Sequence, residues 1–253
     1  MRLAELLGQQ VPGLQLIHLP LLSIIPNEHL ADTQKLQKLV EEADLAIFVS
    51  PNAIECGMRL LQKNWPKSVP IAVVGGGSAE ALNRRGMTAE HGYQIYFPKD
   101  PEHWDSEGLW HELHQTKNDW QDKHILFLRG AGGREWLSEQ FIAHGARITQ
   151  FETYRRVPLS KEAVAWQTLK KADASQSACL LTSSEAVHYF AVYLKEQSDW
   201  GGAWFSLAKM ICSHPRIAET AKNEGFEKVE LCSPGDDNLV FASQNWFNSL
   251  TSS

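Results

Sequence analysis

The stretch FVSPNAIECG, Phe48–Gly57, decides the fold because the chain nearly repeats it. LLTSSEAVHY, Leu180–Tyr189, has the same order: apolar residues, a turn rich in hydroxyl groups, and then Ala with a β-branched residue at the start of a helical pattern. Ser50 matches Ser183 and Ala53 matches Ala186 at the same offset. Both halves of the chain therefore contain a strand that runs through a polar corner into a helix.

The similarity extends beyond this corner. GGGSAEALNRRG (75–86) is echoed by SHPRIAETAKNEG (213–225), and acidic residues open a helical pattern in both WDSEGLW (104–110) and PGDDNLV (234–240). The internal repeat thus covers a whole folding unit.

Short apolar runs alternate with segments of helical period. The runs that predict strands are LQLIHLPLL (14–22), DLAIFVS (44–50), VPIAVVGG (69–76), HILFLRG (124–130), ARITQFETYRR (146–156), ACLLTSS (178–184), WFSLAKMICS (204–213) and FEKVELC (226–232). Strands and helices that alternate in this way form parallel sheets with helices on both faces. The sequence predicts an α/β fold of two similar doubly wound parallel-sheet domains joined by two extended connections. One domain is discontinuous, residues 1–25 plus 157–253, and the other spans residues 26–156.

Composition excludes several classes of protein. The 253 residues are 43% hydrophobic, enough for a large core, and the formal net charge of −6 gives no basic field that would attract nucleic acid. Four cysteines without C-x-x-C spacing and ten scattered histidines favour free thiols and solvated or packed imidazoles over a metal site. Because no signal peptide and no apolar run of membrane-spanning length is visible, we expect a cytoplasmic protein.

Five predicted strand-to-helix corners are rich in small and capping residues. In open parallel sheets, ligands bind beyond the carboxyl ends of the strands, where small residues let an anion reach the free N–H groups of a helix start. The corner residues are Ser50 and Asn52; Gly75, Gly76, Gly77 and Ser78; Gly130, Gly132 and Gly133; Ser183 and Ser184; and Ser213. Plain N-capping is the alternative for any single corner. Matching corners in both halves favour binding of carboxylates or phosphates.

A dinucleotide site fits the sequence poorly. VVGGGSAEAL (73–82) supplies Gly75 and Gly77, but Glu80 occupies the position at which a third glycine or an alanine packs helix against strand. FLRGAGGREWL (127–137) is a sharper feature, because Arg129 and Arg134 flank a glycine-rich loop and guanidinium groups suit carboxylates. The alternative for these arginines is a solvated charge, such as a pair with the neighbouring glutamate.

Taken in order, these segments resemble the uroporphyrinogen-III synthase family from about Leu6 to the C-terminus. The resemblance is carried by FVSPNAI, VVGGGSAEALNRRG, LFLRGAGGREWLSEQF, GARITQFETYRRV, LLTSSEAV and SHPRIAETAKNEGF. It implies two doubly wound α/β domains with the active site in the cleft between them. It also implies the substrate hydroxymethylbilane, a linear tetrapyrrole with eight carboxylates. This substrate loses its hydroxyl group as water and closes to uroporphyrinogen III, with ring D inverted through a spiro-pyrrolenine intermediate.

The resemblance implies no cofactor and no metal, a monomer, and a transient hand-over of substrate from hydroxymethylbilane synthase, with no nucleic-acid or membrane partner. Tyr154 occupies the place of an active-site tyrosine that helps the hydroxyl group to leave, and a tyrosine that only packs at a domain junction is the alternative. Ser78 stands where the family has a hydroxyl residue. The expected substrate-binding residues are Ser50, Asn52, Gly76, Ser78, Arg129, Arg134, Ser183, Ser184, Ser213 and Arg216.

A second function class is a non-catalytic two-domain protein that binds a small carboxylate ligand, because the sequence shows no strong acid–base constellation. Only an enzyme changes the ratio of isomers formed from hydroxymethylbilane, since the free substrate closes without inversion to the type I isomer.

The resemblance further implies an opening strand and a Thr-Arg-Pro turn, which this sequence lacks. A central strand buries several Val- or Leu-sized side chains at about 1.5–3 kcal/mol each. We therefore expect the 253-residue form to be poorly soluble or nearly inactive, and a form extended upstream by that strand and turn to be active. Thermal unfolding and isomer yield of both forms test this expectation. Equal melting temperatures and equal yields of the type III isomer contradict it.

Overall fold

A computed structural model of the chain describes residues 2–11, 13–116, 119–133 and 135–251. The chain divides into two compact units: a terminal unit, Met1–Ser23 with Pro158–Ser253, and a central unit, Ile24–Val157. Both crossings between the units fall within strands, β1 (Leu22–Pro26) and β6 (Arg147–Pro158). That the two units are separate domains stays a prediction.

The described part of the central unit contains a six-stranded sheet with the order β1-β6-β5-β2-β3-β4. Its other strands are β2 (Leu45–Phe48), β3 (Ile71–Val73), β4 (Ile95–Tyr96) and β5 (His124–Gly130). From β6 to β4 all neighbouring strands are parallel. β1 runs antiparallel to β6, since the N–H of Asn27 donates to Thr153 O at 2.9 Å while the N–H of Leu159 donates to Leu21 O at 3.0 Å.

The central strands form because most of their residues are apolar, on both faces. Every residue of β2, β3 and β5 is buried, which is the pattern of parallel strands that helices cover from both sides. Phe48 and Leu128 pack into one hydrophobic cluster. Ile47 and Phe127 pack into another, on the opposite face.

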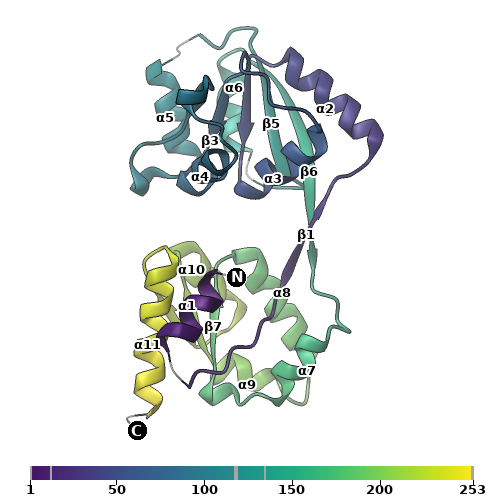
Figure 1. Cartoon of the computed structure of the whole chain (residues 1–253). Helices are drawn as coiled ribbons and strands as arrows, with labels where there is room; N and C mark the ends of the chain where they lie inside the picture. The colour runs from purple at the N-terminus through teal and green to yellow at the C-terminus, as the bar shows by residue number, and fades with distance from the viewer. Residues whose placement is uncertain (1, 12, 117–118, 134, 252–253) are drawn as a thin grey trace. The chain divides into compact units, whose positions relative to one another are not determined.

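Helices cover both faces of this sheet (Figure 1). One layer consists of α2 (Leu30–Glu42), α3 (Pro51–Leu61) and α4 (Gly76–Arg84), and the other of α5 (Ser106–Thr116) and α6 (Trp136–Ala143). Two short 3-10 helices, Ala89–His91 and Pro101–His103, lie in the connections.

The chain changes direction between β2 and β5. The connection after β2 leads to β3 on one side, whereas β5 and then β6 lie on the other side of β2. α3 and α6, which follow β2 and β5, therefore lie on opposite faces of the sheet. Open α/β sheets bind ligands at such a switch point.

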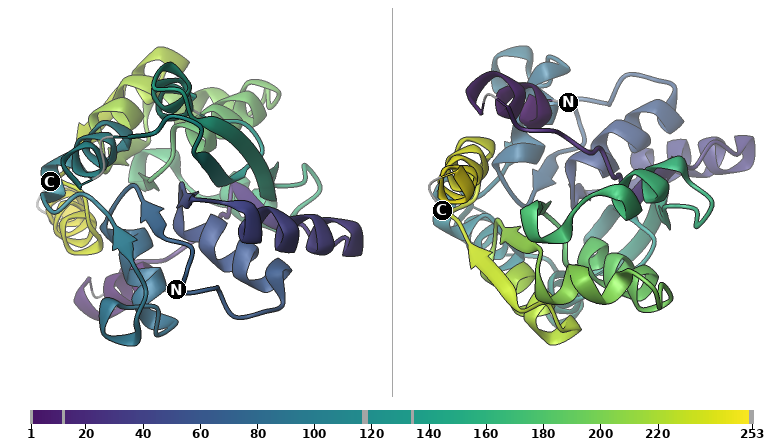
Figure 2. Two further views of the ribbon diagram at one scale, coloured as in Figure 1. Left: turned by 90° about the horizontal axis from the view of Figure 1, so that it is seen from above. Right: turned by 90° about the horizontal axis from the view of Figure 1, so that it is seen from below.

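The terminal unit has a three-stranded parallel sheet within the described residues, in the order β7 (Ala178–Leu181), β8 (Lys209–Cys212) and β9 (Lys228–Leu231). One face carries α7 (Val164–Lys171), α8 (Ser184–Lys195), α9 (Gly201–Ser206) and α10 (Pro215–Glu224), with a short 3-10 helix, Ala174–Gln176, after α7. The other face carries α1 (Arg2–Gln10) and α11 (Asp236–Thr251), which lie side by side (Figure 1 and the right-hand view of Figure 2). Helices thus cover both faces of both sheets, in which all neighbouring strands but β1 and β6 are parallel, and the predicted fold class is confirmed.

Three strand predictions are wrong in more than half of their extent, and one of them is 69–76, of which β3 occupies only Ile71–Val73. Residues 14–21 belong to no helix or strand, and β1 begins only at Leu22. An extended segment needs a neighbouring strand for its backbone groups; here the pairing beside β6 reaches back to Leu21, whose O accepts the N–H of Leu159, and Leu19 packs against the hydrophobic cluster of α7 and α8. The strand predicted at residues 204–213 begins only at Lys209, because the preceding residues complete α9, where Trp204 is buried.

Candidate functional site

Each of the five predicted corners is a junction at which a strand ends and a helix begins. The junctions join β2 to α3, β3 to α4, β5 to α6, β7 to α8 and β8 to α10. Neighbouring strands are parallel, so the three corners of the central unit lie along the carboxyl edge of its sheet. The two corners of the terminal unit lie along the carboxyl edge of the other sheet.

The repeated corner has the same local structure in both units. Ser50 caps α3 by accepting the N–H of Ala53 at 3.1 Å, and Ser183 caps α8 by accepting the N–H of Ala186 at 3.4 Å. Both serines are therefore N-caps. Capping uses only an oxygen lone pair, so each hydroxyl keeps a proton for a further hydrogen bond.

Tyr154, on β6, reaches the Ser50 corner. Its hydroxyl oxygen lies 3.1 Å from Ser50 Oγ and accepts a hydrogen bond from Arg156 Nη2 at 3.2 Å. The Arg156 guanidinium also covers the phenol ring, with Cζ 5.5 Å from the ring centroid. Tyr154 itself is only 2% exposed. Two of the expected site residues are thus brought together, with Arg156 as a third member that was not among them.

Gly130 makes this approach possible. A Cβ atom on Gly130 would lie 2.6 Å from Cε2 and Cζ of Tyr154, closer than carbon atoms pack. The pairing of β5 with β6 is irregular here, because the register shifts between Arg129 and Gly130. Glycine at the end of β5 therefore gives the phenol room beside the Ser50 corner.

Arg129 finds partners for its guanidinium inside the protein. Nη1 donates to Glu135 Oε1 and Gln150 Oε1, both at 2.7 Å, and Nη2 donates to Gly132 O at 2.5 Å. The residue is 6% exposed. These bonds hold the glycine-rich loop and favour a structural role for Arg129. A direct contact of Arg129 with a ligand stays a prediction, and these bonds do not favour it. Arg134, the second arginine of the loop, lies outside the described residues.

Glu135 is the carboxylate of this network. A hydrogen bond from Gln150, and then hydrogen bonding and charge from Arg129, hold the pKa of the Glu135 carboxyl below its ordinary value of 4.5. Gln150 Nε2 donates to Glu135 Oε2 at 2.5 Å, and Ser138 Oγ donates to the same oxygen at 3.1 Å. The charge of Arg129 is therefore neutralised by a neighbour in its own loop.

Trp104 covers the corner before α4. Its ring lies so close to Gly76 that a Cβ atom there would overlap it, whereas a Cβ atom on Gly77 would meet Pro51 Cγ at 3.8 Å. The indole N–H donates to Pro98 O at 3.2 Å, and 47% of the residue is exposed. Trp104 was not among the predicted site residues, because no local pattern connects it with a glycine loop far away in the sequence.

Three further expected residues lie in the first turns of their helices. Ser78 is 3% exposed, and its N–H donates to Gly75 O at 3.0 Å. Asn52 is exposed in α3, and Ser184 is half-buried in α8. A ligand contact through any of these side chains stays a prediction.

A histidine caps the corner before α10. His214 Nδ1 accepts the N–H of Arg216 at 3.2 Å. Half-buried Ser213 lies one residue before this cap and donates its N–H to Leu181 O at 3.4 Å, while the Arg216 side chain is exposed. From the sequence, Ser213 was expected to be the small or capping residue of this corner. The cap lies one residue later, at His214. An imidazole nitrogen can cap a helix because it accepts a hydrogen bond as a hydroxyl oxygen does.

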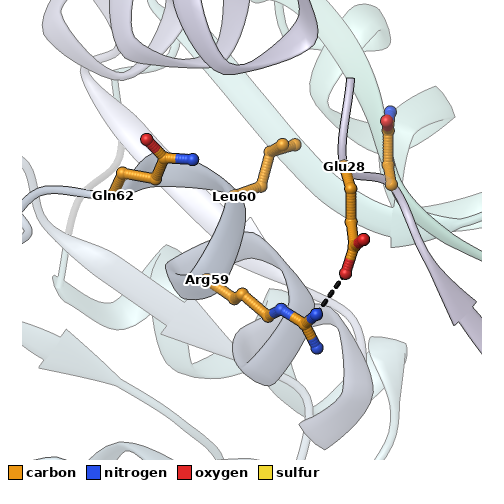
Figure 3. Close-up of a pocket in the computed structure, with 5 residues that line it drawn as sticks. Glu28, Arg59, Leu60 and Gln62 are labelled. Atoms are coloured by element: carbon orange, nitrogen blue, oxygen red, sulfur yellow. Dashed lines mark hydrogen bonds and ion pairs between the residues drawn. The ribbon is translucent and has the colours of Figure 1, made fainter. Parts of the chain in front are cut away.

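Two cavities are lined by other residues. One of about 210 Å³ lies between the chain after β1 and the C-terminal end of α3, where Glu28 and Arg59 form an ion pair (Figure 3). Because α3 begins at the Ser50 corner, this cavity lies at the far end of the helix from that corner. The second, of about 230 Å³, belongs to the terminal unit and includes the stacked rings of Trp166 and Tyr193, 3.7 Å apart. No expected site residue lines either cavity.

The cysteines are poor nucleophiles in this fold. Burial raises the pKa of the Cys179 thiol to about 12 and that of Cys212 to about 11, so both stay uncharged at neutral pH. Among the described residues, no group of His, Cys, Asp and Glu is arranged to hold a metal ion. No helix in the described ranges is both long and apolar enough to cross a membrane.

The fold and its corners define a class: a doubly wound α/β protein whose helix starts present backbone N–H and hydroxyl groups at the carboxyl edge of a sheet. A family model described as "Uroporphyrinogen-III synthase HemD" matches residues 2–240. The chain belongs to the uroporphyrinogen-III synthase family.

Individual relatives agree with this assignment. The uroporphyrinogen-III synthase of Escherichia coli (strain K12) is 25% identical over 230 residues, which are 88% of this chain and 87% of that protein. The enzyme of the same name from Salmonella typhimurium (strain LT2) is 25% identical over 228 residues, 87% of this chain and 86% of that protein.

Solved structures show the same fold. A mutant uroporphyrinogen III synthase from the extremely thermophilic bacterium Thermus thermophilus superposes with a TM-score of 0.63 at 13% identity, over 100% of this chain and 96% of that one. Uroporphyrinogen-III synthetase from Helicobacter pylori 26695 also gives 0.63, at 15% identity, over 94% of this chain and 95% of that one.

The Glu135 network predicts a loss of stability in acid. A carboxyl group whose pKa is lower in the folded state stabilises the fold above its unfolded pKa, and this contribution disappears as the pH falls through the folded pKa. We expect wild type to melt above Glu135→Gln at pH 6, with a gap that narrows below about pH 4.5. Glu139→Gln, at an exposed position of α6, the helix that Glu135 precedes, is the matched control for the change of charge. A gap for Glu135→Gln that is constant from pH 6 to pH 3.5 contradicts the prediction.

Gly76→Ala should displace the Trp104 ring. The added methyl overlaps the ring, and such overpacking typically costs about 1–3 kcal/mol. Gly77→Ala is the control, because its methyl meets only an ordinary contact at 3.8 Å. Denaturant unfolding measures both, and the cost of Gly76→Ala should disappear in a Trp104→Ala background. An equal cost with and without the indole would show that Trp104 does not occupy this corner.

Proposed function

We propose that this protein is a uroporphyrinogen-III synthase that acts on hydroxymethylbilane. It removes the hydroxyl group of this linear tetrapyrrole as water, inverts ring D through a spiro-pyrrolenine intermediate and closes the macrocycle to uroporphyrinogen III. The observation that carries the proposal is the family match over residues 2–240. Relatives of that name that align over most of their own length support it.

Binding of this substrate has to rely on local donors, because the substrate carries eight carboxylates while the chain has a net charge of −6. The helix starts at Ser50, Gly76 and Ser183 offer such donors, since the first N–H groups of a helix have no intrahelical partner. A negative charge at a helix start typically gains about 0.3–1 kcal/mol. Several such contacts would orient a flexible chain without a cluster of cations.

Catalysis of the proposed reaction is mainly conformational, because the free substrate closes readily but without inversion. The protein therefore has to hold ring D so that its substituted carbon is attacked. Departure of the hydroxyl group as water requires one proton, and the paired hydroxyls of Ser50 and Tyr154 are suited to deliver it. The macrocycle and one water account for the whole substrate, so the reaction needs no oxidant or reductant.

A hand-over of substrate belongs to this proposal. Hydroxymethylbilane that waits in solution closes to the type I isomer, so a transient contact with hydroxymethylbilane synthase would protect the type III product.

Isomer analysis tests the proposed function. Hydroxymethylbilane is generated by hydroxymethylbilane synthase in the presence of the protein, both as the 253-residue chain and as a form to which a strand and a Thr-Arg-Pro turn are added, without added metal or nucleotide. The products are oxidised to porphyrins and separated. We expect the type III isomer from native protein and type I alone from heat-inactivated protein. Type I alone from both native forms would overturn the proposal and favour a carboxylate-binding protein without catalytic activity.

A further inference from the structure

The contacts among Arg156, Tyr154 and Ser50 form a chain of hydrogen bonds with a definite direction at each end. A guanidinium can only donate, so Arg156 Nη2 donates to the Tyr154 hydroxyl oxygen at 3.2 Å. At the other end, the N–H of Ala53 donates to Ser50 Oγ at 3.1 Å. Between these ends the two hydroxyl oxygens lie 3.1 Å apart, and one hydroxyl proton fills the gap. The second hydroxyl proton is left over, on either Ser50 or Tyr154.

Burial distinguishes the two arrangements. Tyr154 is 2% exposed, and its ring is enclosed between Gly130 and the Arg156 guanidinium. A leftover proton on Tyr154 would therefore stay in the interior, where an unsatisfied donor is costly. Ser50 is only half-buried and stands at the carboxyl edge of the sheet, so a leftover proton there can reach solvent or a ligand.

We propose that the chain runs from Arg156 through Tyr154 to Ser50, and that the Ser50 hydroxyl proton is the one offered to a bound ligand. In this arrangement Tyr154 and Arg156 are positioning residues, and Ser50 is the group that touches the substrate. The positive charge of Arg156 polarises each hydroxyl in turn, which strengthens the terminal donor. Only the identity of the acceptor rests on the proposed function: it is an oxygen of hydroxymethylbilane, either a carboxylate or the departing hydroxyl group.

The strand itself supplies a matched control. Residues two apart on a strand share a face, so Tyr154 and Arg156 lie on one face of β6. Arg155 points to the other face and is exposed. Arg155→Gln therefore makes the same change of charge without touching the hydroxyl chain.

Kinetics of type III formation measure the role of each member. Ser50→Ala removes the terminal donor and should lower the rate by roughly 100-fold, the lower end of what a positioned proton donor contributes. Ser50→Thr keeps the hydroxyl and the capping oxygen and should recover most of that loss. Tyr154→Phe and Arg156→Gln interrupt the polarisation but leave the Ser50 proton, so each should lower the rate less than Ser50→Ala does. The variant that combines Tyr154→Phe with Arg156→Gln should be no slower than Tyr154→Phe alone. Arg155→Gln should match wild type.

The split between kinetic constants identifies the acceptor. A rise in KM points to a substrate carboxylate, and a fall in kcat points to the departing hydroxyl group. A large loss in Tyr154→Phe with Ser50→Ala close to wild type would make Tyr154 the direct donor and overturn the assignment. Equal losses in Arg155→Gln and Arg156→Gln would remove Arg156 from the chain.

Neutron diffraction from deuterated crystals of the whole chain tests the direction without any turnover. We expect the deuterium between the two hydroxyl oxygens to be bonded to Tyr154 Oη and to point at Ser50. A deuterium bonded to Ser50 Oγ and pointing at Tyr154 would overturn the proposal. A protein with the expected arrangement that forms only the type I isomer would disprove the proposed function and leave the hydrogen-bond chain in place.

Discussion

The parallel pairing of β2 with β5 is the constraint on which the central unit depends. Both strands are buried along their whole length, so each needs helices on two faces, and α3 and α6 leave them on opposite sides. Helices that diverge in this way cannot cover the strand ends between them. The polar corner at Ser50 and the glycine-rich loop after Arg129 thus become neighbours for the same reason that the core is well covered.

Glycine sets how closely other elements approach this pair of strands. Gly57 lies inside α3, where glycine costs about 1 kcal/mol relative to alanine. A Cβ atom there would lie 3.2 Å from Phe48 Cε1 and 3.3 Å from Thr153 Cγ2, so the helix packs tightly on β2 and β6. Gly130 does the same for the Tyr154 ring at the end of β5. Gly57 lowers the helix propensity of α3, and Gly130 lies where the pairing of β5 with β6 is irregular. Both glycines stand at positions where β6 comes close to α3.

The range of each interaction decides what could be predicted from the sequence. Several predicted features depend on residues that are close in the sequence: the succession of strands along the chain, the corners, and the caps at Ser50 and Ser183. The internal repeat made these features recognisable. The helices of segments 75–86 and 213–225, α4 and α10, also end alike, because Gly86 and Gly225 both have positive φ. Contacts between distant segments were not predictable: nothing local connects Trp104 with Gly76 or Arg129 with Gln150. The contact between Arg156 and Tyr154 was more predictable, because residues two apart on a predicted strand lie on the same face.

The chemistry of the proposed substrate favours hydroxyl groups over cations at such a corner. In the proposed reaction, hydroxymethylbilane and uroporphyrinogen III carry the same eight carboxylates, so contacts with carboxylates hold substrate and product alike and do not lower the barrier between them. Arg129 is consistent with this argument, because its charge is neutralised by Glu135 within its own loop. Beyond the orientation of the substrate, the barrier falls only through groups that act where atoms change, at the departing hydroxyl and at ring D. In the proposed hydrogen-bond chain, the Ser50 hydroxyl is a donor whose strength depends on Arg156 but whose contact with the ligand is neutral. Such a donor can assist the departure of water without adding a charge that would retain the octacarboxylate product.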